Sequence, residues 1–314
     1  MIIKPLTIGG LTVENNVFFA PLAGFSTAEM RHIAYKAGAG LCFTEMVSAK
    51  GLTYAPEASK NLLDNLDGDR INAVQLFGNE PEFIRAAACS EHLKDYDIID
   101  LNMGCPMPKI YNNGAGSAIL KNVKLAESLV KAAKASTKPV SVKIRIGLDE
   151  NHIVTEEFCK ALEGAGADMI TVHGRTKAAV YAGEVNFKEI EKAKRAVKIP
   201  VIANGGIFTV KDAEILTEKT GADGVMVARG ALENPLIFSE ITGKKTDFTL
   251  KDLVIEQIQL TAKTYGDKRA GVILRSQIAY YLKGIRGGKK FKERAFKAEN
   301  SGELIKVINE ALSV

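Results

Sequence analysis

The sequence predicts a (β/α)8 barrel, that is a TIM barrel, followed by a small all-helical C-terminal domain. Eight short runs rich in Val and Ile recur along the first three quarters of the chain, and helical patterns lie between most of them. After residue 243 the strand-like runs stop and only helical spacing continues. Alternating strands and helices of this kind indicate a parallel sheet covered by helices, and a barrel of this class needs about 240 residues.

The eight candidate strands are, in order, residues 17–20, 41–45, 72–76, 98–101, 140–144, 169–172, 201–203 and 224–227. The helical patterns between them cover residues 27–37, 81–90, 120–135, 155–165, 186–196 and 210–217. Small residues repeat at three helix–strand junctions, AGAG, GAGAD and TGAD, where glycine ends a helix. An open doubly wound sheet is the alternative, but the turn after the first strand, APLAGFST, lacks the GxGxxG fingerprint.

The C-terminal part differs from the rest in both periodicity and charge. Leu250, Leu253, Val254 and Ile258 recur at helical spacing, so we expect a barrel domain over 1–243 and a helical domain over 244–314. The first part has 27 Lys/Arg against 29 Asp/Glu, and the second has 15 against 8. A basic module on a near-neutral body favours a polyanion partner, although a charge run alone is also typical of a solvated helix face.

Composition excludes several classes of protein. With 314 residues, 46% hydrophobic and 25% charged, the chain is typical of a globular protein. It contains no apolar run of about 18 residues, and its start, MIIKPLTIGG, does not have the layout of a signal peptide. The four cysteines show no CxxC spacing, which favours free thiols. We therefore expect a cytoplasmic protein with no membrane contact, no metal and no obligate protein partner.

The motif LNMGCP at 101–106, with GAGSA at 114–118, is the most informative feature for function. Asn102 leaves the fourth strand, and Cys105 lies in a turn bounded by glycine and proline. In a barrel the chemistry is found where strands end in loops, so this cysteine is presented as a reactive group. The alternative is a small residue that only fills a loop.

Polar or glycine-bearing turns follow the other strands as well. The second strand ends in Thr44-Glu45-Met46. Taken in chain order, the candidate site residues at the other ends are Pro21, Leu22, Ala23, Gln75, Lys143, Arg145, His173, Arg175, Asn204, Gly205, Gly206, Ala228 and Arg229. The NGG turn at 204–206 and the ARG turn at 228–230 expose backbone N–H groups where barrels commonly hold phosphate, and Arg229 adds a planar cation. Polar groups at nearly every strand end favour one large ligand across the barrel mouth.

These groups together suggest a flavin mononucleotide (FMN) site. Reduced flavin carries negative charge near N1 and O2, which a cation such as Lys143 stabilises, and Gln75 and His173 supply further polar contacts. Each residue also has a structural alternative: the NGG turn can be only a tight turn, Lys143 an ion-paired or snorkelling side chain, and His173 a packed core residue.

The motifs also resemble those of a known family, the tRNA-dihydrouridine synthases, and among them the bacterial DusB type. The resemblance covers essentially the whole chain. It rests on APLAGFS, VQLFG, LNMGCP with GAGSA, VKIRIG, TVHGRT, VIANGGI and GVMVARGALENPLIF, in this order along the sequence. Two positions depart from the usual pattern: Leu22 stands where the family usually has Met, and NGG where many members have NGD.

The resemblance implies an FMN-bearing barrel, a C-terminal tRNA-binding domain, and reduction of the C5=C6 bond of tRNA uridines with NAD(P)H. The flavin would contact Pro21, Leu22, Ala23, Gln75, Lys143, His173, Asn204, Gly205, Gly206, Ala228 and Arg229. Asn102 and Arg145 would approach the flavin or the uracil, and all three of Asn102, Arg145 and Arg175 are expected to bind the substrate. The basic tail would hold tRNA through Lys289, Lys290, Lys292 and Arg294.

The resemblance also implies a mechanism. A hydride passes from flavin N5 to uracil C6, and Cys105 gives a proton to C5 as the general acid. The base must leave its stack to reach the flavin. One alternative is another FMN barrel enzyme, such as a dihydropyrimidine or dihydroorotate oxidoreductase, which needs no basic appendage. The other is a non-catalytic RNA-binding protein, which leaves Cys105 and Lys143 unexplained.

Overall fold

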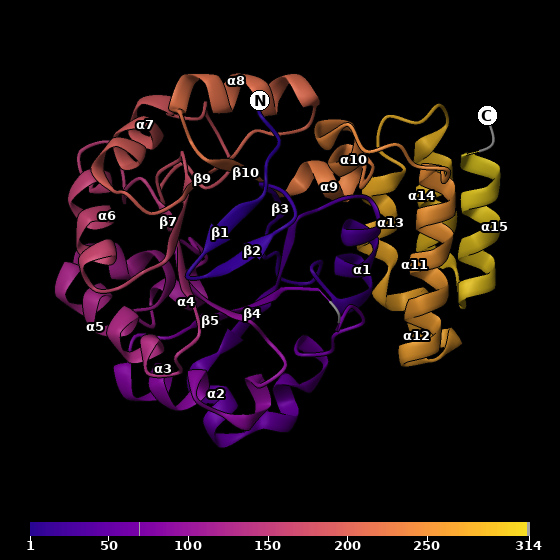
Figure 1. Ribbon diagram of the computed structural model, residues 1–314. Coiled ribbons are helices and arrows are strands. Elements are labelled where there is room, and N and C mark those ends of the chain that lie inside the picture. Colours follow the sequence, from indigo (N-terminus) through magenta and orange to yellow (C-terminus); the bar gives the residue numbers. More distant parts are fainter. Residues whose placement is uncertain (69, 313–314) are drawn as a thin grey trace.

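The computed structural model describes residues 1–68 and 70–312 and contains a closed barrel of eight parallel strands (Figure 1). Each strand pairs with the next in the chain, and the last pairs with the first. The strands are β3 (Val17–Phe19), β4 (Leu41–Ser48), β5 (Asn72–Phe77), β6 (Ile98–Met103), β7 (Val140–Arg145), β8 (Met169–His173), β9 (Val201–Asn204) and β10 (Gly224–Val227). The predicted fold class is confirmed, and the strand positions agree within three residues.

Helices surround the barrel, as the sequence predicts. They are α1 (Ala28–Lys36), α3 (Pro81–Ala88), α5 (Val123–Lys134), α6 (Thr155–Gly164), α7 (Phe187–Ala196) and α8 (Val210–Thr220). Side chains of Thr27, Asn122, Asn186 and Thr209 cap four of these helices by accepting a backbone N–H three residues later. Helix α5 begins later than expected, because residues 116–121 form a 3₁₀ helix. Two short helices, α2 (Ala49–Tyr54) and α4 (Pro108–Tyr111), were not predicted.

An N-terminal hairpin that the sequence analysis missed covers one end of the barrel (Figure 1). It consists of β1 (Leu6–Ile8) and β2 (Leu11–Val13), joined by two glycines with φ of +53° and +92°. Leu6, Ile8 and Val13 belong to one buried cluster with side chains from the interior of the barrel. Alternating residues around Gly-Gly are a known hairpin signal, so LTIGGLTV contained this information.

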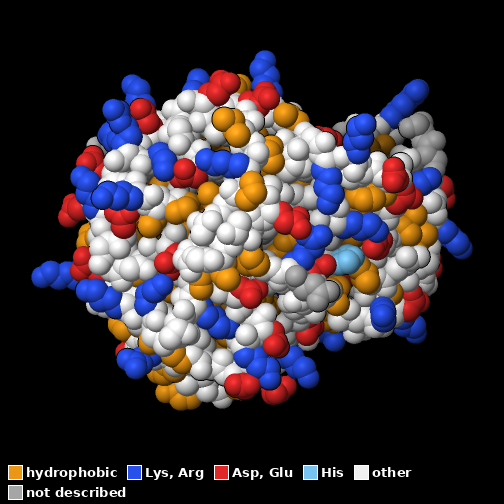
Figure 2. All heavy atoms as spheres, viewed as in Figure 1, with side chains coloured by type: hydrophobic (Ala, Val, Ile, Leu, Met, Phe, Trp, Pro, Cys, Tyr) orange, Lys and Arg blue, Asp and Glu red, His pale blue; other side chains and the backbone are white. Residues whose placement is uncertain are grey.

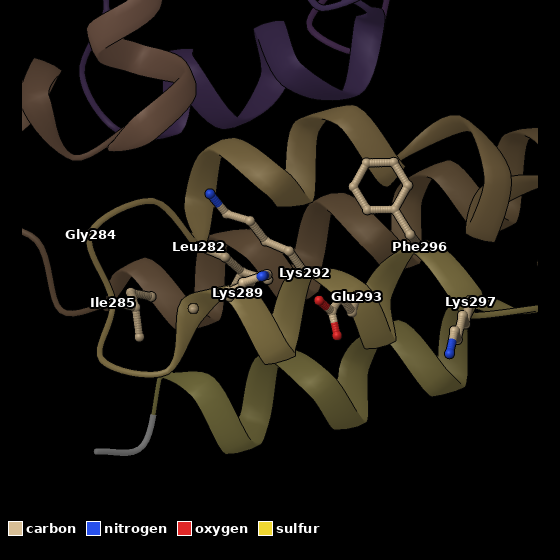
Figure 3. A pocket seen from close by; sticks show the side chains of 9 residues that line it. Leu282, Gly284, Ile285, Lys289, Lys292, Glu293, Phe296 and Lys297 are labelled. Carbon is tan, nitrogen blue, oxygen red and sulfur yellow. The ribbon is translucent and has the colours of Figure 1, made fainter.

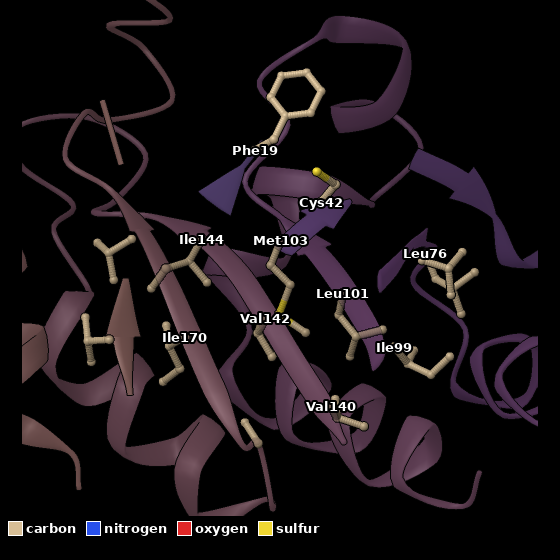
Figure 4. Close-up of a cluster of buried hydrophobic side chains, with 14 of the residues drawn as sticks. Phe19, Cys42, Leu76, Ile99, Leu101, Met103, Val140, Val142, Ile144 and Ile170 are labelled. Atoms are coloured by element: carbon tan, nitrogen blue, oxygen red, sulfur yellow. The ribbon is translucent and has the colours of Figure 1, made fainter. Parts of the chain in front are cut away.

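The main hydrophobic core lies between the strands and the surrounding helices. Figure 4 shows part of it, with side chains such as Ile99, Val140, Val142 and Ile170 projecting from neighbouring strands. Parallel strands in a barrel are buried on both faces, so their sequences are nearly continuous apolar runs. This is why the strands were readable from composition alone.

The C-terminal helices pack beside α1 (Figure 1) and form an apolar cluster of their own. After α9 (Arg229–Glu233) and α10 (Ile237–Thr242) come α11 (Leu250–Tyr265), α12 (Asp267–Ile273), α13 (Arg275–Tyr281), α14 (Gly288–Lys297) and α15 (Ser301–Ala311). Leu253 packs in the barrel core, whereas Val254 packs in the C-terminal cluster. Helix α11 therefore contributes to both, and a domain boundary at residue 243 stays a prediction. Within residues 1–68 and 70–312, no helix has the length and apolar character for crossing a membrane.

Candidate active site

A cavity of about 500 Å³ lies at the carboxyl ends of the barrel strands. Residues from the ends of all eight strands line it, and Tyr280 of α13 joins them from the C-terminal helices. The structure thus brings together at one place the predicted flavin and catalytic residues and the three residues expected at the substrate, namely Pro21, Leu22, Ala23, Gln75, Asn102, Cys105, Lys143, Arg145, His173, Arg175, Asn204, Gly205, Gly206, Ala228 and Arg229.

The turn that carries Cys105 is held from two sides. Asn102 Oδ1 accepts the backbone N–H groups of Gly104 at 3.2 Å and Cys105 at 2.9 Å. From the other side, Ser117 donates to the Cys105 carbonyl through its N–H at 3.0 Å and its hydroxyl at 2.8 Å. A Cβ on Gly116 would lie 2.8 Å from the same carbonyl oxygen. LNMGCP and GAGSA are therefore two parts of one structural unit.

Burial sets the protonation state of this cysteine. Cys105 is partly exposed to the cavity, and desolvation raises the pKa of its thiol, while Arg145 and Lys143 act in the opposite direction. A thiol with a raised pKa keeps its proton at neutral pH. Cys105 is therefore suited to give a proton rather than to act as a thiolate nucleophile.

Lys143 is the buried cation of the cavity. Its Nζ donates to Asn204 Oδ1 at 2.9 Å, and the Asn204 amide nitrogen donates to the Met226 carbonyl at 2.7 Å. Burial, with repulsion by Arg145, lowers the pKa of Lys143 to about 7. An anionic group bound in the cavity would raise this pKa again, because it favours the charged ammonium.

The glycine turn after β9 leaves room beside a neutral histidine. Gly205 and Gly206 have φ of +120° and +73°, and a Cβ on Gly205 would lie 2.8 Å from His173 Cδ2. Burial and the surrounding cations lower the pKa of His173 far below its usual range, so the ring is neutral. Its Nε2 lies 3.4 Å from Arg175 Nη1, and a guanidinium can only donate, so Nδ1 carries the proton.

Arg145 and Arg175, two of the predicted substrate-binding residues, donate hydrogen bonds to backbone carbonyl groups. Arg145 donates to the carbonyls of Gly104 at 3.0 Å and Thr176 at 2.8 Å. Arg175 donates through Nε to Ala182 at 3.1 Å and through Nη2 to Gly183 at 2.9 Å. Both arginines line the cavity while they tie the loops after β6 and β8 in place. Their contact with substrate stays a prediction.

The sequence analysis missed two exposed aromatic residues at the rim. Tyr181 and Phe208 are 49% and 40% exposed, and the Arg229 guanidinium lies 4.8 Å and 5.8 Å from the centres of their rings. Lys283, from the loop after α13, lies 5.9 Å from the Phe208 ring. Phe208 follows the NGGI motif directly and could have been found by reading on. Nothing in the sequence around Tyr181 indicated its position.

The predicted tRNA-binding residues of the tail separate onto two sides of α14. Lys289 and Lys292 line a hollow of about 630 Å³ together with Phe296, which is 48% exposed (Figure 3). Arg294 instead forms a two-pronged ion pair with Glu310 of α15, and Lys290 acts on the same carboxylate. The four residues therefore do not form one patch.

Charge elsewhere is mixed. Figure 2 shows the face that carries the β1–β2 hairpin, where acidic and basic side chains are interspersed. This arrangement agrees with the near-neutral composition of residues 1–243 and gives that face little attraction for a polyanion.

The donors in the cavity fit a flavin. Lys143 supplies a cation, Gln75 and Asn102 supply side-chain amides, and the turn at 205–206 offers a wall without side chains. In the described part of the chain no group of three His, Cys, Asp or Glu residues is placed to hold a metal ion.

The closed parallel barrel, with a polar cavity at the carboxyl ends of its strands, has the architecture of a TIM-barrel enzyme. Morphinone reductase, a solved structure, shares this fold with a TM-score of 0.57 at 16% identity, over 77% of this chain and 89% of that chain. The family model described as dihydrouridine synthase (Dus) matches residues 18–313. The chain therefore belongs to the dihydrouridine synthase family.

Individual relatives agree with this assignment. The tRNA-dihydrouridine synthase B of Pasteurella multocida (strain Pm70) is 34% identical over 303 residues, covering 93% of this chain and 91% of the relative. The probable tRNA-dihydrouridine synthase 1 of Synechocystis sp. (strain ATCC 27184 / PCC 6803 / Kazusa) is 35% identical and covers 99% of this chain and 90% of the relative.

Proposed function

We propose that this protein is a cytoplasmic, FMN-dependent tRNA-dihydrouridine synthase that uses NAD(P)H to reduce the C5=C6 bond of specific tRNA uridines. The observation that carries the proposal is the pairing of a protonated Cys105 with the buried Lys143 amine, which an anionic ligand would keep charged, in one cavity of a chain that belongs to the dihydrouridine synthase family. An acid and a cation are the two groups that this reduction requires from the protein.

Different cavity residues would contact the ring system and the phosphate of FMN. Lys143 and Gln75 would face the electron-rich ring system, and the backbone of 205–206 with Arg229 would hold the phosphate. Bound FMN, once reduced by NAD(P)H, would supply the hydride for C6 of uracil. Asn204 keeps the Lys143 ammonium in place for this role.

Cys105 would complete the reduction by giving its proton to C5. A carbanion that develops at C5 needs an acid on the other face of the base, and a thiol of raised pKa is still protonated at pH 7 to 8. The bonds from Asn102 and Ser117 fix the turn, which keeps the sulfur within reach of one position. Fixed geometry of this kind lowers the entropic part of the barrier.

The rest of the molecule would present the RNA. A uridine must leave its stack to enter the cavity, and exposed rings such as Tyr181 and Phe208 suit stacking on neighbouring bases. Lys289 and Lys292 on α14 would contact phosphates. These contacts are what separates an enzyme acting on tRNA from one acting on a free pyrimidine.

The proposal is tested with purified protein, FMN, NAD(P)H and an unmodified tRNA transcript. We expect a yellow protein that converts uridine in the transcript to dihydrouridine, detected by mass spectrometry of nucleosides. Free uracil and orotate serve as competing substrates. Reduction of these molecules with none of the transcript would contradict the proposal in favour of a small-molecule oxidoreductase, and a protein that does not bind flavin would contradict it altogether.

A further inference from the structure

A buried carboxylate below the cavity has no part in the proposed chemistry. Asp100 lies on β6, is 1% exposed, and is absent from the cavity lining. Its Oδ2 accepts a hydrogen bond from Gln75 Nε2 at 2.6 Å, and its Oδ1 accepts one from the Ser141 hydroxyl at 2.5 Å. A carboxylate so far from water needs a reason, because burying it without compensation is costly.

A chain of hydrogen bonds connects Asp100, through Gln75 and Asn102, to the turn that carries Cys105. Gln75 Oε1 accepts from Asn102 Nδ2 at 2.8 Å, and Asn102 Oδ1 accepts the N–H groups of Gly104 and Cys105. An ionised carboxylate only accepts, so it must face the nitrogen end of the Gln75 amide. This leaves the oxygen end for Asn102, and it leaves the Asn102 oxygen for the turn.

We propose that Asp100 is a positioning residue whose negative charge sets the direction of the Gln75 and Asn102 amides and thereby holds the turn that carries Cys105. A reversed Gln75 amide would point an oxygen at the carboxylate and an NH2 group at the NH2 group of Asn102. Both contacts would be lost, and Asn102 could regain a bond to Gln75 only by turning its own oxygen away from the N–H groups of the turn. The inference rests on the proposed function for the role of Cys105, but the hydrogen-bond chain itself does not.

The orientation of the Gln75 amide also leaves one of its N–H groups available to a ligand in the cavity. An amide nitrogen carries two hydrogens, and among the described residues the structure gives Gln75 Nε2 one acceptor, Asp100. The second hydrogen is left for a group in the cavity, which Gln75 and Asn102 both line. Asp100 therefore acts on the ligand through Gln75 without touching it.

Charges around Asp100 predict how the chain responds to pH. Lys143 on β7 is the charged group that acts on it, with Ser141 on β7 and Gln75 on β5 as hydrogen-bond donors. Burial raises the pKa of Asp100 to about 6, against the opposing effect of these three groups. The carboxylate is ionised at pH 7 to 8, and it loses its ability to fix the Gln75 amide as the pH falls through about 6.

Three variants separate this role from simple packing. Asp100→Leu has no acceptor for Gln75. Asp100→Asn can still offer Gln75 an oxygen if its own nitrogen faces the Ser141 hydroxyl, so it is the conservative rescue. Ser141→Ala removes the other hydrogen bond to the carboxylate but leaves Gln75 held. It is the matched control at the same buried site.

Two measurements need no tRNA. The first is the dissociation constant of FMN from the apoprotein, and the second is the rate of iodoacetamide alkylation of Cys105, mapped by peptide mass spectrometry with exposed Cys89 as internal control. For Asp100→Leu we expect FMN affinity to fall roughly 10- to 100-fold and Cys105 alkylation to rise several-fold relative to Cys89. At pH 8, where the Asp100 carboxylate is ionised, Ser141→Ala should match the wild type in both, and Asp100→Asn should lie between.

The pH profile of single-turnover tRNA reduction is the third readout. The wild type should lose rate as the pH falls through about 6, Ser141→Ala should lose it at a higher pH, and Asp100→Asn should show no such limb. Equal losses in Ser141→Ala and Asp100→Leu, or a folded Asp100→Leu protein with wild-type FMN affinity and Cys105 reactivity, would overturn the proposal. If the wild type does not reduce tRNA, the proposed function fails, while the two tRNA-free measurements still decide the role of Asp100.

Discussion

Cys105 and Lys143 are the two residues on which the proposed chemistry depends, and burial shifts the pKa of both. Burial raises the pKa of the Cys105 thiol and lowers that of the Lys143 ammonium to about 7. The first shift keeps a proton on the acid. The second makes the positive charge conditional on an anionic ligand, so binding and charge are linked.

Replacing the acid should separate cofactor binding from catalysis. Cys105→Ala should retain FMN, because the side chain is proposed to give a proton and not to hold the cofactor. Its single-turnover reduction of tRNA should fall about 10²- to 10⁴-fold, the usual contribution of a general acid. Flavin content and tRNA reduction are measured on the same preparation. A variant that reduces tRNA at nearly the wild-type rate would show that Cys105 is not the acid.

Lys143 should make FMN binding depend on pH. Below about pH 7 the ammonium is charged in the apoprotein, and above it the amine is neutral, so wild-type affinity for FMN should fall as pH rises through 7. Lys143→Met should bind FMN more weakly at pH 6.5 and show a flatter dependence than the wild type. Fluorescence titration of apoprotein from pH 6.5 to 9, where Asp100 is mostly ionised, measures both curves. Identical curves would return Lys143 to a structural role.

Strands and helices were predicted well from the sequence, because each depends on residues within one segment. Contacts between residues of different segments were not predicted. The eight strands were readable because both of their faces are buried, whereas the β1–β2 hairpin was missed although its Gly-Gly turn was visible. Asp100 falls within the predicted strand 98–101, and nothing in its sequence neighbourhood indicates a role for its side chain. Its partners Gln75 and Ser141 lie on two other strands, and only the barrel register brings them together.

The close packing of LNMGCP against GAGSA predicts that an added side-chain atom at Gly116 disturbs the turn that carries Cys105. Gly116→Ala puts a Cβ 2.8 Å from the Cys105 carbonyl at a residue with φ of +59°. Gly221→Ala is the matched control, with φ of +64° at the end of α8 and no atom near the added Cβ. Backbone strain should cost each variant about 1 kcal/mol of stability, and the close contacts should cost Gly116→Ala more than that. Only Gly116→Ala should also lose tRNA reduction while it keeps FMN. Similar activity in the two variants would contradict the coupling of the motifs.

Helix α13 connects the C-terminal helices to the barrel and to its cavity. Tyr280 of α13 lines the cavity and meets Phe25 edge-on, with 5.4 Å between ring centres, and Gln277 donates to the Leu232 carbonyl at 3.1 Å. The sequence predicted a basic helical module here, but a charge run does not reveal which face of a helix each cation occupies. Only the structure separates Lys289 and Lys292 from Lys290 and Arg294.

This separation changes the expected effect of removing charge. Lys289→Gln with Lys292→Gln should lower the slope of log affinity for tRNA against log salt by about one to two units and raise KM for tRNA. Lys290→Gln with Arg294→Gln removes the same charge from the side that faces Glu310 and should change the slope less. NAD(P)H oxidation by the bound flavin should stay unchanged in both pairs. Circular dichroism and melting curves confirm folding, and equal slopes in both pairs would contradict binding through the Lys289–Lys292 side.

The most direct test of the central claim is nucleoside analysis of total tRNA from cells that lack this protein. We expect dihydrouridine to disappear at one or more tRNA positions, to return when the wild-type chain is expressed, and to stay absent when Cys105→Ala is expressed at the same level. An unchanged dihydrouridine content in the deletion strain, or full restoration by the Cys105→Ala chain, would contradict the account.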